Sequence, residues 1–119
     1  MSTLKADTIQ STGGGAATLT KQVAAKATIA ADDAASIFDS FNISSGSDEG
    51  TGDYDYNITS AFNATIAQKC CSGVCLGSTG VVRVKGARAT ASVIDIAVLN
   101  SSFNNTDGNH ALAVHGDLL

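Results

Sequence analysis

The chain has 119 residues, a formal net charge of −4 and only seven Lys and Arg residues. A chain of this length forms one domain and buries about two-thirds of the surface that it exposes when unfolded. So few basic residues give no positive surface for nucleic acid or for an anionic membrane, and we predict neither as a partner. No apolar run approaches the roughly 20 residues of a membrane span, and the first ten residues lack the apolar stretch of a signal peptide. We therefore expect synthesis in a cytosol, without export by the usual route.

The expected hydrophobic core is lean. Leu, Ile, Val and Phe together make up 27 residues, Trp is absent, and 19 residues are Ala. Small side chains each bury little area, at about 25 cal/mol per Å², so the monomer is expected to be only marginally stable. Burial between subunits would add to that stability, and the composition therefore favours an obligate oligomer.

The N-terminal region is expected to be an arm followed by a short helix. Residues 1 to 15 end in three glycines, which mark a flexible break. The Ala-rich stretch that follows favours a helix near residues 19 to 26. We assign residues 1–25 to this region and residues 26–119 to a separate module.

The module is predicted to be mainly β, an antiparallel β-sandwich or barrel. Short apolar segments alternate there with Gly, Asn, Ser and Asp, which is typical of strands joined by turns. The expected strands are residues 35–43, 53–60, 64–70, 80–86, 89–100 and 110–116.

The stretch GTGDYDYNIT at residues 50–59 has two interpretations. The spacing of Asp53, Asp55 and Asn57 opens an EF-hand calcium loop, which also needs Gly at its sixth position and Glu at its twelfth. Ile58 and Ala64 stand at those positions. The EF-hand pattern therefore fails.

The favoured interpretation is a half-buried strand facing water. Tyr54, Tyr56 and Ile58 fall on one side of an extended chain and the aspartates on the other. The alternative left open is weak calcium binding in a β-rich loop, by Asp48, Glu49, Asp53 and Asp55.

Residues 93–99 are apolar on both faces of an expected strand, which suits a central strand or one covered by a neighbouring subunit. Asp95 interrupts this pattern and is expected to lie at an interface or near a rim with a partner, because an unpaired buried charge costs several kcal/mol. The candidate subunit-interface residues are Val93, Asp95, Ala97 and Leu99.

Two polar loops, residues 44–52 and 100–109, are the candidate binding loops, because loops on a rigid scaffold often carry binding residues. Phe103 in the second loop is either a plug for the core or an exposed contact, and we favour the plug. The candidate binding residues are Asp48, Glu49, Asn104, Asn105 and Asp107.

The titratable residues indicate no catalytic or metal site. His110 and His115 are five positions apart, so in one strand they project to opposite faces and cannot share a metal or a proton. Cys70, Cys71 and Cys75 lack the paired spacing of a zinc site and are expected to be small buried thiols at a strand end. We predict no enzyme, no catalytic residue, no metal and no cofactor.

Five segments, taken in order, resemble the small tail-fibre-like virion modules of tailed bacteriophages, particularly marine ones. They are STLKADTI at 2–9, AAKA at 24–27, DSFNISS at 39–45, GTGDY at 50–54 and VHGD at 114–117. The sequence departs from that pattern at Thr28–Ala31 and at Cys70–Cys75, which puts the interface packing and the receptor-contact surface in question.

The resemblance implies a non-enzymatic β-sandwich or barrel that assembles as a homotrimer on the virion, after synthesis in the host cytoplasm. Its expected partners are other virion proteins of the tail or capsid, and a host surface receptor or glycan. The N-terminal region would attach it to the particle, with Leu4 and Ile9 as candidate contacts. The alternatives are a capsid decoration protein that stabilises the head and a stand-alone carbohydrate-binding β-sandwich.

Overall fold

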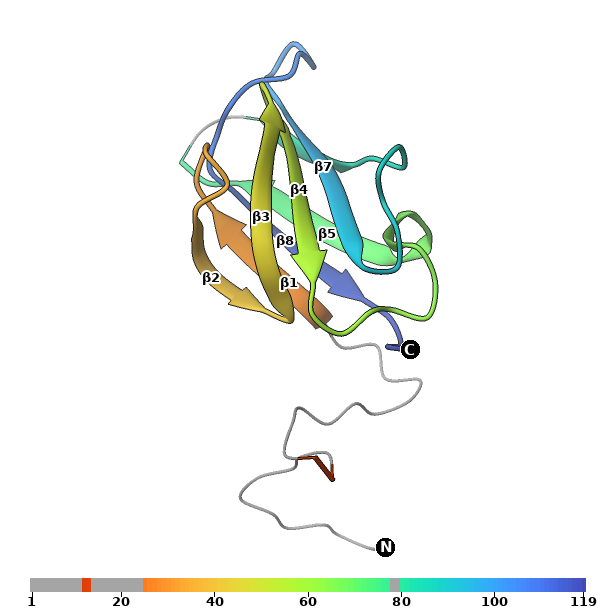
Figure 1. Ribbon diagram of the computed structural model, residues 1–119. Helices are drawn as coiled ribbons and strands as arrows, with labels where there is room; N and C mark the ends of the chain where they lie inside the picture. Colours follow the sequence, from red (N-terminus) through yellow and green to blue (C-terminus); the bar gives the residue numbers. More distant parts are fainter. Residues whose placement is uncertain (1–11, 14–24, 78–79) are drawn as a thin grey trace, which may run out of the picture.

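The computed structural model describes residues 12–13, 25–77 and 80–119, and nearly all of them belong to one β-sandwich (Figure 1). Its elements are β1 (Ala25–Ala31), β2 (Ile37–Phe41), β3 (Ile43–Gly50), β4 (Asp53–Ile58), the short 3-10 helix η1 (Ile66–Gln68), β5 (Cys70–Cys75), β6 (Val81–Val84), β7 (Val93–Leu99) and β8 (His110–His115).

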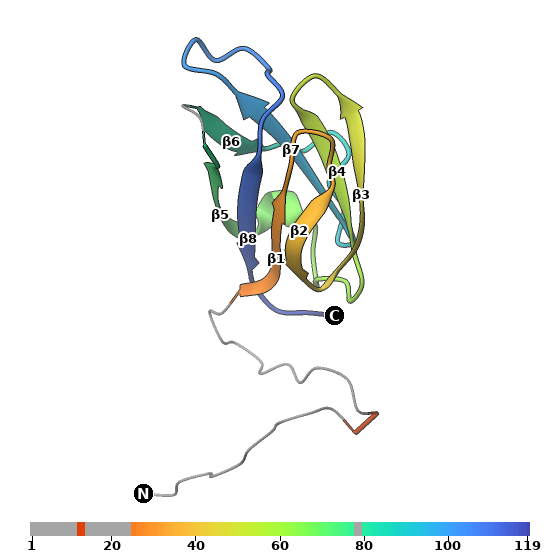
Figure 2. The ribbon, with the colours of Figure 1, turned by 90° about the vertical axis from the view of Figure 1, so that its left-hand side faces the viewer.

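Two antiparallel sheets of four strands each pack face to face (Figures 1 and 2). Sheet 1 has the order β2-β1-β8-β5, and sheet 2 has the order β3-β4-β7-β6. The predicted mainly β sandwich is therefore confirmed. Within the described part of the chain, no helix has the length and apolar character needed to cross a membrane.

The core lies between the sheets and is made by the alternate residues that each strand turns inward. Ile29 of β1 and Val114 of β8 meet Tyr54 and Tyr56 of β4 and Ile96 of β7, and all five side chains are buried. The alternation of Tyr54 and Tyr56 with aspartates confirms the strand predicted for this stretch.

Asn42 turns the chain from sheet 1 into sheet 2. It has a positive φ of 62°, which Asn tolerates better than most residues. Its side-chain amide donates to the carbonyl oxygens of Lys26 and Ser60, both at 3.0 Å, and its side-chain oxygen accepts from the Ser60 N–H at 2.7 Å. These bonds join the corner to strands on both sides of it.

Three local predictions differ from the structure. The expected helix near residues 19 to 26 lies mostly outside the described residues, and its last two residues begin β1. The expected strand at 64–70 is wrong, because the 3-10 helix η1 lies within it at Ile66–Gln68 and β5 runs from Cys70 to Cys75. Residues 43–50 form β3, although residues 44–52 were expected to form a polar loop.

Candidate functional site

Three aspartates lie together on the outer face of sheet 2. Tyr54 and Tyr56 point into the core, so Asp53 and Asp55 project from the opposite face of β4. Asp55 pairs across the ladder with Asp95 of β7. One carboxylate oxygen from each aspartate lies within 4.8 Å of the others. We call these three residues the aspartate cluster.

Two basic side chains close the aspartate cluster. Arg88, in the loop between β6 and β7, places Nε 2.7 Å from Asp55 Oδ2 and Nη2 2.5 Å from Asp53 Oδ1. The same Nη2 is 3.2 Å from Asp95 Oδ1, and the Arg88 backbone N–H donates to Asp95 Oδ2 at 2.9 Å. Lys85 Nζ lies 2.9 Å from Asp53 Oδ1. One guanidinium therefore contacts all three carboxylates and holds the loop against the sheet.

Asp95 depends on these contacts most, because its side chain is fully buried. A buried carboxylate without a partner costs several kcal/mol, whereas here both of its oxygens accept from Arg88. The partner that the sequence required for Asp95 lies within the same chain.

The charges of the cluster reinforce one another. Burial alone would raise the pKa of Asp53. Hydrogen bonds from Arg88 and Lys85, together with their positive charges, outweigh the effect of burial and hold the pKa of Asp53 below its usual 3.8. Hydrogen bonds to Asp55 and then to Asp53 raise the pKa of Arg88. Asp53 and Arg88 are therefore both charged at neutral pH.

The aspartate cluster has the oxygen ligands of a cation site, but protein cations already contact them. A metal ion would have to displace Arg88 and Lys85 from bonds of 2.5 to 3.2 Å. Asp48 and Glu49, named in the calcium alternative, are not part of this group. The expectation that Asp53 and Asp55 simply face water is also corrected, since both are half-buried beneath Arg88. The arrangement fastens a loop to a sheet.

The candidate interface residues lie on this same face of β7. Asp95, Ala97 and Leu99 are buried by the chain itself, and Val93 is half-buried. β7 is a central strand with β4 on one side and β6 on the other. The two-sided apolar pattern therefore needs no neighbouring subunit to explain it.

The two candidate binding loops meet at one end of the sandwich. The Gly52 N–H donates to Asp107 Oδ1 at 2.8 Å, and the Thr106 N–H donates to the Val98 carbonyl oxygen at 3.0 Å. Asp107 also accepts from the Tyr54 hydroxyl at 3.3 Å, so this residue has a structural role. All five candidates are exposed, namely Asp48, Glu49, Asn104, Asn105 and Asp107.

Phe103 does not plug the core. Its side chain is 73% exposed, in a turn where its φ is +63°. The Phe103 N–H donates to the Asn100 carbonyl oxygen at 2.9 Å, so a local turn sets its direction. The favoured interpretation of Phe103 as a plug is wrong.

A buried histidine joins the two sheets. His110 stacks on Tyr54 with ring centroids 4.5 Å apart, and its Nε2 lies 2.5 Å from the Tyr56 hydroxyl. Its Nδ1 lies 2.8 Å from the Gly108 carbonyl oxygen, which can only accept, so Nδ1 carries the proton and Nε2 accepts from Tyr56. His115 faces the other side of β8, as predicted, and is half-buried.

This arrangement predicts that stability falls as the pH drops below about 6.5. Burial lowers the pKa of His110 from its usual 6.5, so below that pH the unfolded chain binds a proton that the folded chain does not. The stabilisation is complete above pH 6.5 and declines, by at most about 1.4 kcal/mol per pH unit, down to the folded pKa.

Urea midpoints measured between about pH 7.5 and pH 5 test the His110 prediction. The His115→Gln variant should keep the dependence, and the His110→Gln variant should lose it. An equal slope in wild type and His110→Gln would contradict the assignment.

The cysteines lie at the two ends of β5, as predicted: Cys70 and Cys71 begin the strand and Cys75 ends it. Cys70 is exposed, Cys71 and Cys75 are half-buried, and all three thiols are free. Burial raises the pKa of Cys71 and Cys75, which lowers the fraction of reactive thiolate. The prediction of fully buried thiols is therefore corrected.

The fold and the aspartate cluster define a β-sandwich domain whose main charged cluster is structural. Comparison with protein-family models, curated proteins and solved structures gives no match. Leu4 and Ile9, the candidate attachment residues, lie outside the described residues.

Proposed function

We propose that this chain is a non-enzymatic structural module of a bacteriophage virion, displayed as a homotrimer that serves host attachment or particle assembly. The observation that carries the proposal is the apolar edge of sheet 1. Ile37, Phe38 and Phe41 of β2 are 36%, 61% and 48% exposed. Soluble monomers usually protect an edge strand with charges, Pro or a covering segment, so this edge fits a chain that assembles with others.

The aspartate cluster supports the non-enzymatic part of the proposal. Acid–base catalysis by a carboxylate pair needs oxygens that can reach a substrate and exchange protons. Asp53, Asp55 and Asp95 are instead held by Arg88, and the pKa of Asp53 is lowered. These carboxylates are suited to holding a loop.

The virion location is supported by the resemblance of the sequence to tail-fibre-like modules. Tail fibre and capsid decoration are distinguished by copy number per particle, since a decoration protein covers the whole head. Tyr54 and Tyr56 are buried and cannot stack on a sugar, so the carbohydrate-binding alternative would depend on the exposed phenylalanines Phe38, Phe41 and Phe103.

Deletion of residues 1–15 tests the proposal in particles. The sandwich begins with β1 at Ala25, so the truncated chain keeps every described strand. We expect it to fold and to be missing from purified virions, whereas a full-length Phe103→Ser variant should be incorporated normally. Immunoblots of particles would measure both. Undiminished incorporation of the truncated chain would show that residues 1–15 do not attach it.

A further inference from the structure

The outer faces of the two sheets differ sharply in chemistry. An antiparallel sheet that faces water usually places polar residues on its outer face. Sheet 2 follows this rule with its aspartate cluster, Lys85 and the exposed Arg83. Sheet 1 does not, because its central outward positions carry small or apolar side chains. They are Thr28 and Ala30 on β1, Ala111 and Ala113 on β8, and Ser72 and Val74 on β5.

These outward residues form rows across sheet 1. Ala111 pairs with Ala30 on one side and with Val74 on the other. In the next row Ala113 lies between Thr28 and Ser72. Because these side chains are small, the outer surface of sheet 1 is lowest at its centre, over β1 and β8.

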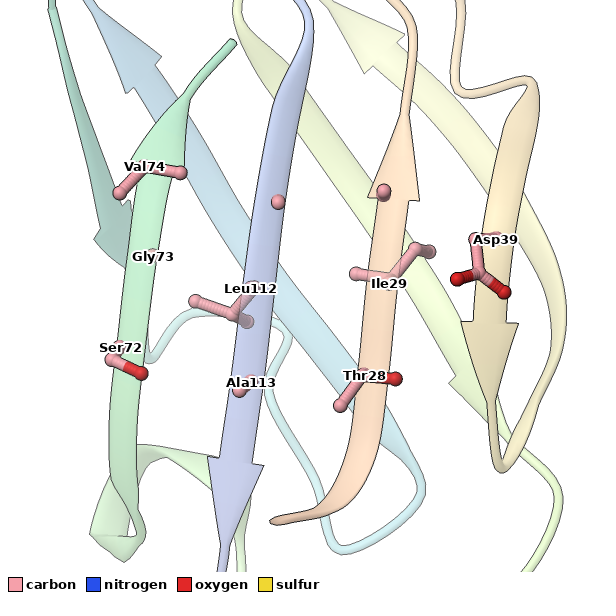
Figure 3. Close-up of a pocket in the computed structure, with 10 residues that line it drawn as sticks. Thr28, Ile29, Asp39, Ser72, Gly73, Val74, Leu112 and Ala113 are labelled. Atoms are coloured by element: carbon pink, nitrogen blue, oxygen red, sulfur yellow. The ribbon is translucent and has the colours of Figure 1, made fainter.

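A hollow of about 340 Å³ lies over this centre (Figure 3). Asp39 of β2 is the one charged residue among those that line it. Exposed apolar side chains flank the hollow on both edges of sheet 1: Phe41 on β2, which pairs with the outward Thr28, and Val74 on β5, which is 57% exposed. The face thus combines a central hollow with protruding rims.

We propose that a second copy of this chain docks on the outer face of sheet 1, with the apolar rim of one copy seated in the hollow of the other. The inference rests on the proposed function, because it names the surface through which the module assembles. The rim and the hollow are different patches, so seating the rim of one copy in the hollow of the next is a heterologous contact, which can close into the ring of three chains that the proposed function expects.

The size of the face agrees with a protein partner. An aromatic side chain offers about 150–250 Å², and Phe41 exposes 48% of its surface. Four strands about 4.8 Å apart and about 20 Å long make a face on the order of 400 Å², the size of a small interface when compared with the roughly 800 Å² per partner of a standard one. Its low charge matches the depletion of charged residues at interface centres.

Two substitutions on this face and two matched controls test the inference. Phe41→Ser removes the aromatic of the rim, and Phe103→Ser removes a more exposed aromatic elsewhere. Ala113→Glu places a charge in the hollow, and Ala87→Glu places one on an exposed loop beside sheet 2. All four sites are at least partly exposed, so each variant should fold; circular dichroism of the full chain checks this.

Sedimentation equilibrium of the full chain gives the result. We expect wild type and both controls to associate alike, and both face variants to raise the dissociation constant at least about tenfold. If the face variants associate as tightly as wild type, another surface joins the copies and the inference is overturned, although assembly itself stands. A monomeric wild type also overturns it, for instance where residues 1–24 of the same chain cover the face. Incorporation into virions tests the proposed function independently.

Discussion

Arg88→Ala is expected to destabilise the fold by about 2–4 kcal/mol, less than the roughly 3–5 kcal/mol of a fully buried ion pair, because the Arg88 side chain is 39% exposed. The guanidinium neutralises Asp53 and Asp55 and donates to the fully buried Asp95. Without it, Lys85 would remain as the cation of the cluster, 3.7 Å from Asp95 Oδ1. Three aspartates would then face one another with a single positive charge.

Chemical denaturation measures this effect, with Arg83→Ala as the matched control. Arg83 is exposed on β6, which belongs to the same sheet. Its loss should change the free energy of unfolding by less than about 0.5 kcal/mol. Adding Asp95→Asn to Arg88→Ala should recover part of the stability, because the buried charge is then gone. Equal stabilities for the Arg88→Ala and Arg83→Ala variants would contradict the role assigned to the cluster.

Gly52→Ala is expected to cost about 2–4 kcal/mol, since it combines backbone strain with overpacking. Gly52 has φ of +62°, and a Cβ there would lie 2.6 Å from the Thr106 nitrogen and 2.6 Å from the Val98 carbonyl oxygen. Both are backbone atoms, so neither can rotate away. The substitution would separate the two loops that meet at this end of the sandwich.

Gly50→Ala is the control for this effect. Gly50 also has a positive φ, +147°, but nothing lies within 4 Å of its added Cβ. Its variant should therefore show the conformational cost alone. Thermal unfolding of both variants measures the difference, and if Gly50→Ala is as destabilising as Gly52→Ala, the close backbone contact does not matter.

The strands that could be predicted are those with a clear pattern. Tyr54, Tyr56 and Ile58 alternate with polar residues because one face of β4 forms the core. β7 is apolar on both sides because its outer face lies beneath Arg88 and Lys85. β4 therefore shows an alternating pattern and β7 a continuous apolar run, and both patterns are visible in the sequence.

The elements that were missed lack such a pattern. β3 is an edge strand whose polar, Gly-rich residues are largely exposed, so they resemble a turn. β1 is rich in Ala, which favours helix in isolation, but pairing with β2 and β8 makes it a strand. Contacts with neighbouring strands, and not local sequence preference, therefore determine that β1 and β3 are strands.

The aspartate cluster could be predicted only in part. The sequence showed that Asp95 needed a partner, and it placed Asp53 and Asp55 on one strand face. It could not show that Arg88 binds them, because these contacts join residues 33 and 35 positions apart through an irregular loop. No periodic pattern marks such a residue.

The native mass of the full chain at micromolar concentration tests the central claim most directly, that this sandwich works as an assembled module. Each chain has a mass of 11.9 kDa. We expect sedimentation equilibrium to give the mass of three chains, stable to dilution. A single-chain mass at every concentration would contradict the account, and would mean that the exposed edge of β2 is not an assembly surface.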